Sequence, residues 1–259
     1  MDKVQIKKLI DNPELIPGIH NYCDRWCERC PLTKRCAVFA MEQAESADPS
    51  TYDPENEAFW LRFKGTLDAT LEMLQEMARE AGVDLDSLVA EEDAAKESRV
   101  NRETGEHELV RAAMEYMRMV GEWFELADGQ TGDSTTEADP ESKAADLKEM
   151  EDVILWYRAF ICAKLRRAVQ REGRGQPDSL NDMPEDSDGS AKIALIAIDR
   201  SIAAWWRMRA YFPKRIDRKL NFLVRLDRLR RGVEKAFPNA GAFVRPGFDE
   251  YPPRCLKSY

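Results

Sequence analysis

The stretch that decides the fold is Ser190-Ala-Lys-Ile-Ala-Leu-Ile-Ala-Ile-Asp-Arg-Ser-Ile-Ala-Ala-Trp-Trp-Arg-Met-Arg-Ala-Tyr211, the most apolar helix-like segment of the chain. Its large apolar residues recur mostly at intervals of three or four, which is the spacing of one face of an α-helix. These residues are Ile193, Leu195, Ile198, Ile202, Trp205 and Trp206. The spacing predicts a long helix that buries one face against other helices.

Similar apolar stripes predict long helices on both sides of this segment. They lie at 53–81, 106–127 and 140–171 before it and at 214–237 after it. No part of the chain alternates apolar and polar residues for long enough to indicate a β-sheet. The sequence therefore predicts an all-α fold, a bundle of five or six long helices with an N-terminal cysteine-rich loop docked on it.

Changes in composition divide the chain into three predicted parts. Residues 1–45 form a cysteine-rich metal-binding segment, and residues 46–237 form the helical bundle. The tail 238–259, rich in proline and aromatic residues, is expected to pack on the bundle. Polar stretches that contain Gly and Pro, near 129–140 and 173–188, indicate mobile linkers within the bundle.

The composition restricts the classes of protein that this chain can belong to. The charged fraction is 34% and the formal net charge is −9, which argues for a soluble protein that does not bind nucleic acid indiscriminately. No apolar run approaches the roughly 18 residues needed to span a membrane. The first residues mix charged and apolar side chains and do not resemble a secretory signal. We therefore expect a cytoplasmic protein without membrane association.

Charge is unevenly distributed along the chain. Residues 42–151 contain 30 acidic and 10 basic residues, whereas residues 158–235 contain 10 acidic and 19 basic residues. This asymmetry indicates either that the two halves complement each other within the fold or that a basic face binds an anionic partner. The candidate basic face lies on the C-terminal helix and consists of Arg215, Arg218, Lys219, Arg225, Arg228 and Arg231.

Four of the six cysteines lie within fourteen residues near the N-terminus. The segment reads Cys23-Asp-Arg-Trp-Cys27-Glu-Arg-Cys30-Pro-Leu-Thr-Lys-Arg-Cys36. A zinc ion or an iron–sulfur cluster needs four sulfurs that converge on one point, and short loops between the ligands allow this. Neighbouring basic residues lower the pKa of a thiol and favour the thiolate. In a reducing compartment, clustered cysteines are typical of metal ligands rather than disulfides.

The run Cys27-x2-Cys30-Pro-x4-Cys36 resembles the 4Fe–4S segment of radical-SAM auxiliary domains and the cluster staple of some CRISPR-associated and helicase-linked exonucleases. The resemblance covers about ten residues and implies a 4Fe–4S cluster as the cofactor. Cys23-x3-Cys27-x2-Cys30 also has the spacing of the radical-SAM core motif. That fold requires a barrel of alternating strands and helices, which the rest of the sequence does not predict.

Zinc is the alternative metal, although zinc sites usually contain two C-x2-C pairs and this segment contains one. Two further residues are candidates for the site. His20 precedes Cys23 by three residues and is either a substitute ligand or a neighbour of the site. Cys255, in the tail, is either a free thiol or a residue that approaches the N-terminal cysteines.

Three charged residues fall within the apolar stripes of two predicted helices. Lys164 lies in the stripe of 140–171, while Asp199 and Arg209 lie in the stripe of the quoted segment. A buried charge is costly without a partner, so we expect these residues to form a buried ion-pair network between the two helices. The same groups, with Tyr157 and Glu151, are the candidates for an enzyme active site.

Three functions follow from these features. The first is a cytoplasmic metal-binding protein whose 4Fe–4S cluster has a redox, sensing or structural role on a helical interaction module. The second is a zinc-stabilised helical module that binds a partner protein or nucleic acid through its basic C-terminal helix. The third is an enzyme with a site between the Lys164 and Asp199 helices. No Gly-rich phosphate loop or histidine-based motif supports a particular reaction, so the sequence leaves enzymatic activity open.

Overall fold

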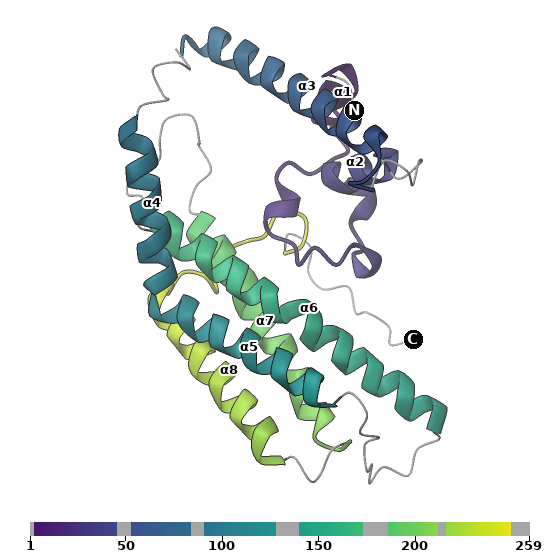
Figure 1. Cartoon of the computed structure of the whole chain (residues 1–259), viewed down its shortest axis with the longest axis vertical. Helices are drawn as coiled ribbons and strands as arrows, with labels where there is room; N and C mark the ends of the chain where they lie inside the picture. The colour runs from purple at the N-terminus through teal and green to yellow at the C-terminus, as the bar shows by residue number, and fades with distance from the viewer. Residues whose placement is uncertain are drawn as a thin grey trace. The chain divides into compact units, whose positions relative to one another are not determined.

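The described parts of this computed structural model are entirely helical. They are residues 3–45, 53–83, 91–127, 140–172, 186–211 and 216–249. Within these ranges the chain forms eight α-helices, three short 3-10 helices and no β-strand (Figure 1). The predicted all-α class is confirmed, and the number of helices is higher than the predicted five or six.

The helices follow one another without other regular structure. They are α1 (Lys3–Ile10), α2 (Ala37–Glu45), α3 (Glu57–Ala81), α4 (Glu91–Glu106), α5 (Glu108–Ala127), α6 (Pro140–Glu172), α7 (Asp186–Met208) and α8 (Ile216–Ala236). The higher number arises from the short helices α1 and α2 and from the separation of α4 and α5 at His107. There the Nδ1 atom of His107 accepts a hydrogen bond from the backbone N–H of Leu109 at 3.3 Å. None of the helices in the described ranges has the length and apolar composition needed to cross a lipid bilayer.

The chain folds into two compact units, and the boundary between them falls within α4. The first unit contains Met1–Lys96 and Val244–Tyr259, and the second contains Glu97–Phe243. The first unit is thus built from both ends of the chain, with the second unit as an insertion between them. The expected linkers lie almost wholly outside the described residues, as does the end of the tail with Cys255.

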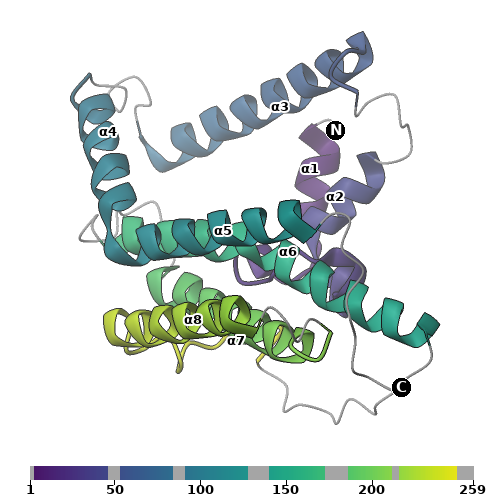
Figure 2. The ribbon, with the colours of Figure 1, turned by 60° about the horizontal axis from the view of Figure 1, so that its bottom comes forward.

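The second unit is a four-helix bundle. Helix α6 packs most extensively on α7, α5 contacts α6 and α8, and α7 contacts α8. Consecutive helices run in opposite directions (Figures 1 and 2). The predicted stripe of α6 is buried as expected, with Met150, Ile154, Tyr157, Ile161, Leu165 and Ala168 all at most 1% exposed. Trp206, in contrast, lies at the exposed edge of α7 with 57% of its surface accessible.

An aromatic cluster holds α5, α7 and α8 together inside this bundle. The ring of Trp205 stacks on Phe222, with 4.1 Å between centroids and 9° between planes. Trp123 meets Trp205 edge to face at 5.5 Å. The indole N–H of Trp205 donates to the hydroxyl oxygen of Tyr116 at 3.0 Å, and both residues are buried. Burial raises the pKa of Tyr116 to about 12, so its hydroxyl stays protonated at neutral pH.

In the first unit, α3 begins after Asn56, whose side-chain oxygen accepts from the N–H of Ala58 at 3.0 Å. It ends at Gly82, which adopts the left-handed φ of 68° and donates its N–H to the carbonyl oxygens of Ala78 and Arg79. This is a common way for a helix to end, because glycine adopts a positive φ without strain. Helix α1 packs against α3, and Lys3 pairs with Glu76.

We predict that Tyr116→Phe destabilises the bundle by about 1–3 kcal/mol, because it leaves the buried indole N–H of Trp205 without its acceptor. Urea denaturation followed by far-UV circular dichroism measures the loss. The control is Tyr211→Phe, since Tyr211 donates to Asp146 at 3.1 Å and that carboxylate is half exposed. We expect a smaller effect there, and equal losses in the two variants would contradict the prediction.

Candidate metal centre

The cysteine loop lies between α1 and α2 and consists of tight turns. Cys27 begins the 3-10 helix Cys27–Arg29, and its carbonyl oxygen accepts from the N–H of Cys30 at 3.1 Å. Cys30 is extended, with φ −86° and ψ 122°, as expected for a residue before proline. Cys36 closes the 3-10 helix Thr33–Arg35 by donating its N–H to Thr33 at 3.2 Å, and α2 starts at the next residue. The loop therefore reverses direction between successive cysteines.

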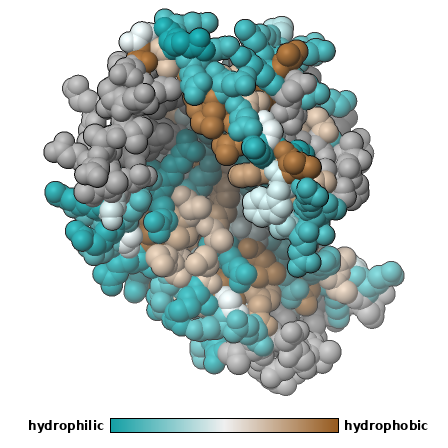
Figure 3. Space-filling view, turned by 45° about the horizontal axis from the view of Figure 1, so that its top comes forward, coloured by the Kyte–Doolittle hydropathy of each residue, from teal (hydrophilic) through white to brown (hydrophobic). Residues whose placement is uncertain are grey.

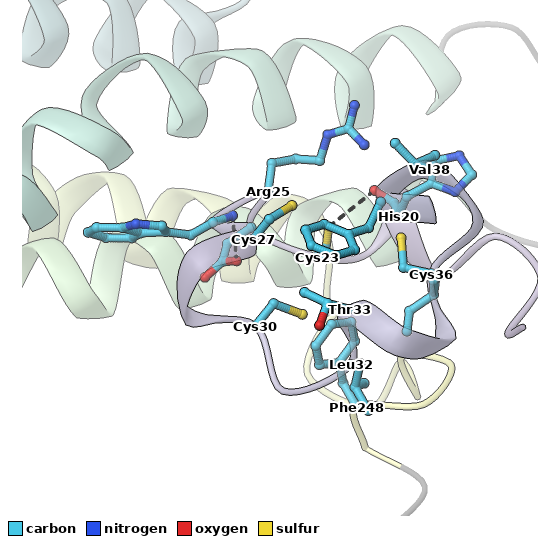
Figure 4. Close-up of a pocket in the computed structure, with 14 residues that line it drawn as sticks. His20, Cys23, Arg25, Cys27, Cys30, Leu32, Thr33, Cys36, Val38 and Phe248 are labelled. Atoms are coloured by element: carbon cyan, nitrogen blue, oxygen red, sulfur yellow. Dashed lines mark hydrogen bonds between the residues drawn. The ribbon is translucent and has the colours of Figure 1, made fainter. Parts of the chain in front are cut away.

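These turns bring all four cysteines to one pocket. Figure 4 shows Cys23, Cys27, Cys30 and Cys36 around it. Each of the four is a free, partly buried thiol. The other lining residues are Ile19, His20, Asp24, Arg25, Trp26, Leu32, Thr33, Val38, Phe39 and Phe248. The wall thus combines four thiols with a largely apolar surround, and His20 is a neighbour of the cysteines.

The electrostatics of Cys27 show that the four thiols lie close enough to interact. Burial raises the pKa of the Cys27 thiol most strongly, and the carboxylate of Glu42 raises it further. The thiols of Cys23, Cys30 and Cys36 also raise this pKa. Negative charges that gather around one point disfavour another thiolate there. Without a cation, the pocket therefore disfavours ionisation of Cys27.

The loop has its own internal supports. The N–H of Ile16 donates to the carbonyl oxygen of Arg35 at 2.9 Å, and the Nε of Arg35 donates to the carbonyl oxygen of Glu14 at 3.3 Å. The guanidinium of Arg29 lies 3.7 Å from the ring centroid of Trp26. Arg25, which lines the pocket, has a positive φ of 59°, a conformation uncommon for residues other than glycine.

A C-terminal segment that the sequence analysis did not assign to the site completes the pocket. Phe248 is one of the lining residues, and Gly247 has a φ of 75°. A Cβ on Gly247 would lie 2.5 Å from the Cδ1 of Ile16 and 3.2 Å from that of Ile19. Glycine is required here both for the backbone conformation and for the close approach. The proline- and aromatic-rich composition of the tail was the only signal of this packing.

The first unit has little apolar core besides this pocket. Its buried apolar residues, among those that the structure describes, are Ile6, Ile19, Tyr22 and Ala69. A unit with such a small core usually needs a disulfide or a metal to fold stably. The four cysteines form no disulfide in the structure.

The thiols surround the pocket without meeting at a single point. In the described ranges, no group of three or more His, Cys, Asp or Glu side chains is placed to hold a metal ion. A tetrahedral zinc site requires all four sulfurs within about 2.3 Å of one ion. A cubane cluster binds each thiolate through a different iron and so accepts sulfurs that are further apart.

The predicted buried network of Lys164, Asp199 and Arg209 is wrong. Asp199 lies at the surface with 54% of its side chain exposed and pairs with Arg230 at 2.7 Å. The guanidinium of Arg209 lies 3.2 Å from the ring centroid of Trp206, which is itself exposed. Only Lys164 is buried, with its ammonium 5.4 Å from the ring centroid of Phe160. The prediction failed because Asp199 lies at the outer edge of the α7 stripe and Arg209 lies beyond the end of α7 at Met208.

The two other candidates for an enzyme site take separate roles in the bundle. The hydroxyl of Tyr157, a buried residue of α6, accepts a hydrogen bond from Arg200. Glu151 is half buried, and burial, followed by the neighbouring Asp152, raises the pKa of its carboxyl group. These contacts explain both residues as parts of the helix packing.

Much of the basic charge of α8 is neutralised within the bundle. Arg230 pairs with Asp199 and with Glu234 at 2.8 Å. Arg231 pairs with Asp227 at 3.0 Å, and Arg225 lies 3.9 Å from Glu115 of α5. Of these contacts, the one between Arg225 and Glu115 joins the acidic and basic parts of the sequence, as does the pair of Arg207 with Asp146 at 3.2 Å. The other pairs lie within the basic part.

Lys219, which the sequence analysis placed on the basic face, is fully buried. Its ammonium donates to the carbonyl oxygen of Arg209 at 3.1 Å, just beyond the C-terminus of α7. Burial, and then the charge of Arg209, lower the pKa of Lys219 to about 8. A cation at this position interacts favourably with the C-terminal carbonyl groups of α7. Arg215 lies outside the described residues.

We predict that Asp199→Ala lowers the free energy of unfolding by less than about 1 kcal/mol, because it removes an exposed ion pair. Arg230 keeps Glu234 as a partner in this variant. Chemical denaturation of the variant and the parent chain measures the difference. A loss of about 3–5 kcal/mol would indicate a stranded buried charge and would contradict the surface position.

The chain matches no protein-family model, no curated protein and no solved structure in the comparisons. No residue therefore takes its role from a relative. The candidate metal centre rests on the chemistry and the positions of the chain's own cysteines.

Proposed function

We propose that the chain binds a 4Fe–4S cluster through Cys23, Cys27, Cys30 and Cys36, and that this cluster stabilises the first unit. The observation that carries the proposal is that four free thiols line one pocket in a unit with only four buried apolar residues among those described. Binding free energy is folding free energy where the site does not exist in the unfolded chain. The cluster thus supplies the cohesion that the small core lacks.

The surroundings of the pocket favour a cluster over a single zinc ion. The thiols are spread around the pocket, and apolar side chains such as Leu32, Val38 and Phe248 line it with them. An apolar wall excludes water from the cluster sulfides, which influences the reduction potential of the cluster. Arg25 provides a positive charge near a group that four thiolates make strongly negative. Zinc is the alternative, and it requires the loop to close further.

The ligands must lose their protons before they bind metal. The raised pKa of Cys27 means that its thiol is protonated at neutral pH in the metal-free chain. Cluster binding therefore releases protons and weakens as the pH falls. Partial exposure of all four cysteines leaves the cluster accessible to small oxidants, which is compatible with a sensing or redox role in addition to the structural one.

We expect anaerobically purified chain to contain about four iron and four sulfide ions and to absorb near 400 nm. Cys27→Ser/Cys30→Ser should lose both the iron and the absorption. Cys162→Ala is the control, because Cys162 is a buried thiol on α6 in the second unit and should not affect the metal content. About one zinc ion per chain and no colour would replace the cluster with structural zinc. A parent chain without either metal would contradict the proposal.

We also predict that removal of the metal unfolds the first unit and leaves the bundle folded, because Cys23, Cys27, Cys30 and Cys36 are not part of the core of the bundle. Hydrogen exchange with mass spectrometry measures this for the chain before and after anaerobic oxidation and chelation. Protection should disappear in residues 3–45 and 244–249 and should persist in α5–α8. Unchanged protection of the cysteine loop would show that its fold does not depend on metal.

A further inference from the structure

Helix α3 exposes a continuous apolar face. Its members recur at intervals of three or four residues and are each between 47% and 62% exposed. We define the α3 stripe as Trp60, Phe63, Leu67, Leu71, Leu74 and Met77. In the upper part of Figure 3, where α3 lies, brown side chains stand among hydrophilic ones. Single exposed apolar residues are common, but a contiguous row of six marks an interaction surface.

The opposite face of α3 is the one that packs within its own unit. That face contains Ala69, the one buried residue of α3, and Glu76, which pairs with Lys3 of α1. It is more polar than the α3 stripe. A helix that serves only its own unit buries its most apolar face, so the orientation of α3 indicates that the α3 stripe has a separate partner.

The α3 stripe is large enough for a stable interface between two copies. Trp60 and Met77 are seventeen residues apart, so the stripe is roughly 26 Å long at 1.5 Å per residue. With on the order of 200 Å² for each large side chain, the exposed fractions correspond to roughly 600 Å² per copy. Two copies would bury about 1,200 Å², the lower end of the range for specific interfaces.

We propose that the α3 stripe pairs with the α3 stripe of a second copy of this chain, with the two helices antiparallel. In a two-fold arrangement centred between Asp68 and Ala69, Trp60 meets the partner's Met77, and Phe63 meets the partner's Leu74. Large aromatic residues at one end thus lie against flexible aliphatic residues at the other. This match in size allows close packing along the whole stripe.

The sizes of the side chains favour this antiparallel arrangement. A parallel pair would instead place Trp60 beside the partner's Trp60 and Met77 beside the partner's Met77, so the large and the small ends of the stripe would not match.

The test is sedimentation equilibrium of the full chain, purified anaerobically, at concentrations from 1 to about 100 μM. The expected parent is a dimer. Leu67→Glu/Leu74→Glu should weaken dimerisation by at least about 100-fold, because each copy loses apolar burial and gains charge at the centre of the interface. Val4→Glu is the matched control, since Val4 is an exposed apolar residue on α1 of the same unit and lies outside the stripe.

Two results would overturn the proposal. One is a monomeric parent chain, and the other is a loss of dimerisation in the Val4→Glu control equal to that in Leu67→Glu/Leu74→Glu. The α3 stripe contains no cysteine, so these results are independent of which metal is bound.

Discussion

The scarcity of buried apolar residues in the first unit is the constraint on which the rest of this structure depends. The conformational entropy lost on folding must be offset by burial, and the four buried apolar residues in the described part of the unit offset little of it. The unit is instead organised around its pocket. Turns, a glycine with positive φ and a C-terminal aromatic residue all converge on the four thiols. Their arrangement makes sense if coordination replaces a hydrophobic core.

The second unit, in contrast, contains most of the buried apolar residues of the described chain. Its four helices bury a large apolar interior in which Trp205, Phe222, Trp123 and Tyr116 pack as one aromatic cluster. The acidic and basic parts of the sequence meet as ion pairs on the surface of this bundle, as between Arg207 and Asp146. Such exposed pairs contribute little to stability, so the aromatic interior holds the bundle together.

Sequence periodicity was sufficient to predict the helices and the buried face of α6, because a helix in the middle of a bundle repeats its environment every turn. It was insufficient at the edges of a stripe. Asp199 and Trp206 occupy positions of α7 next to buried residues, and only the positions of the neighbouring helices decide that they face solvent. Cysteine spacing likewise predicted the shared pocket, but Phe248 joins it through a contact between distant parts of the chain that no local pattern encodes.

The position of Phe248 also has a consequence for biosynthesis. The cysteines leave the ribosome first, and Phe248 follows more than two hundred residues later. All helices of the bundle are translated in this interval, so they can fold before Phe248 is available to line the pocket. During that time the thiols lack this part of the wall and are open on one side. Translation of the C-terminal segment then closes the pocket, so closure of the pocket is the last step in completing the first unit.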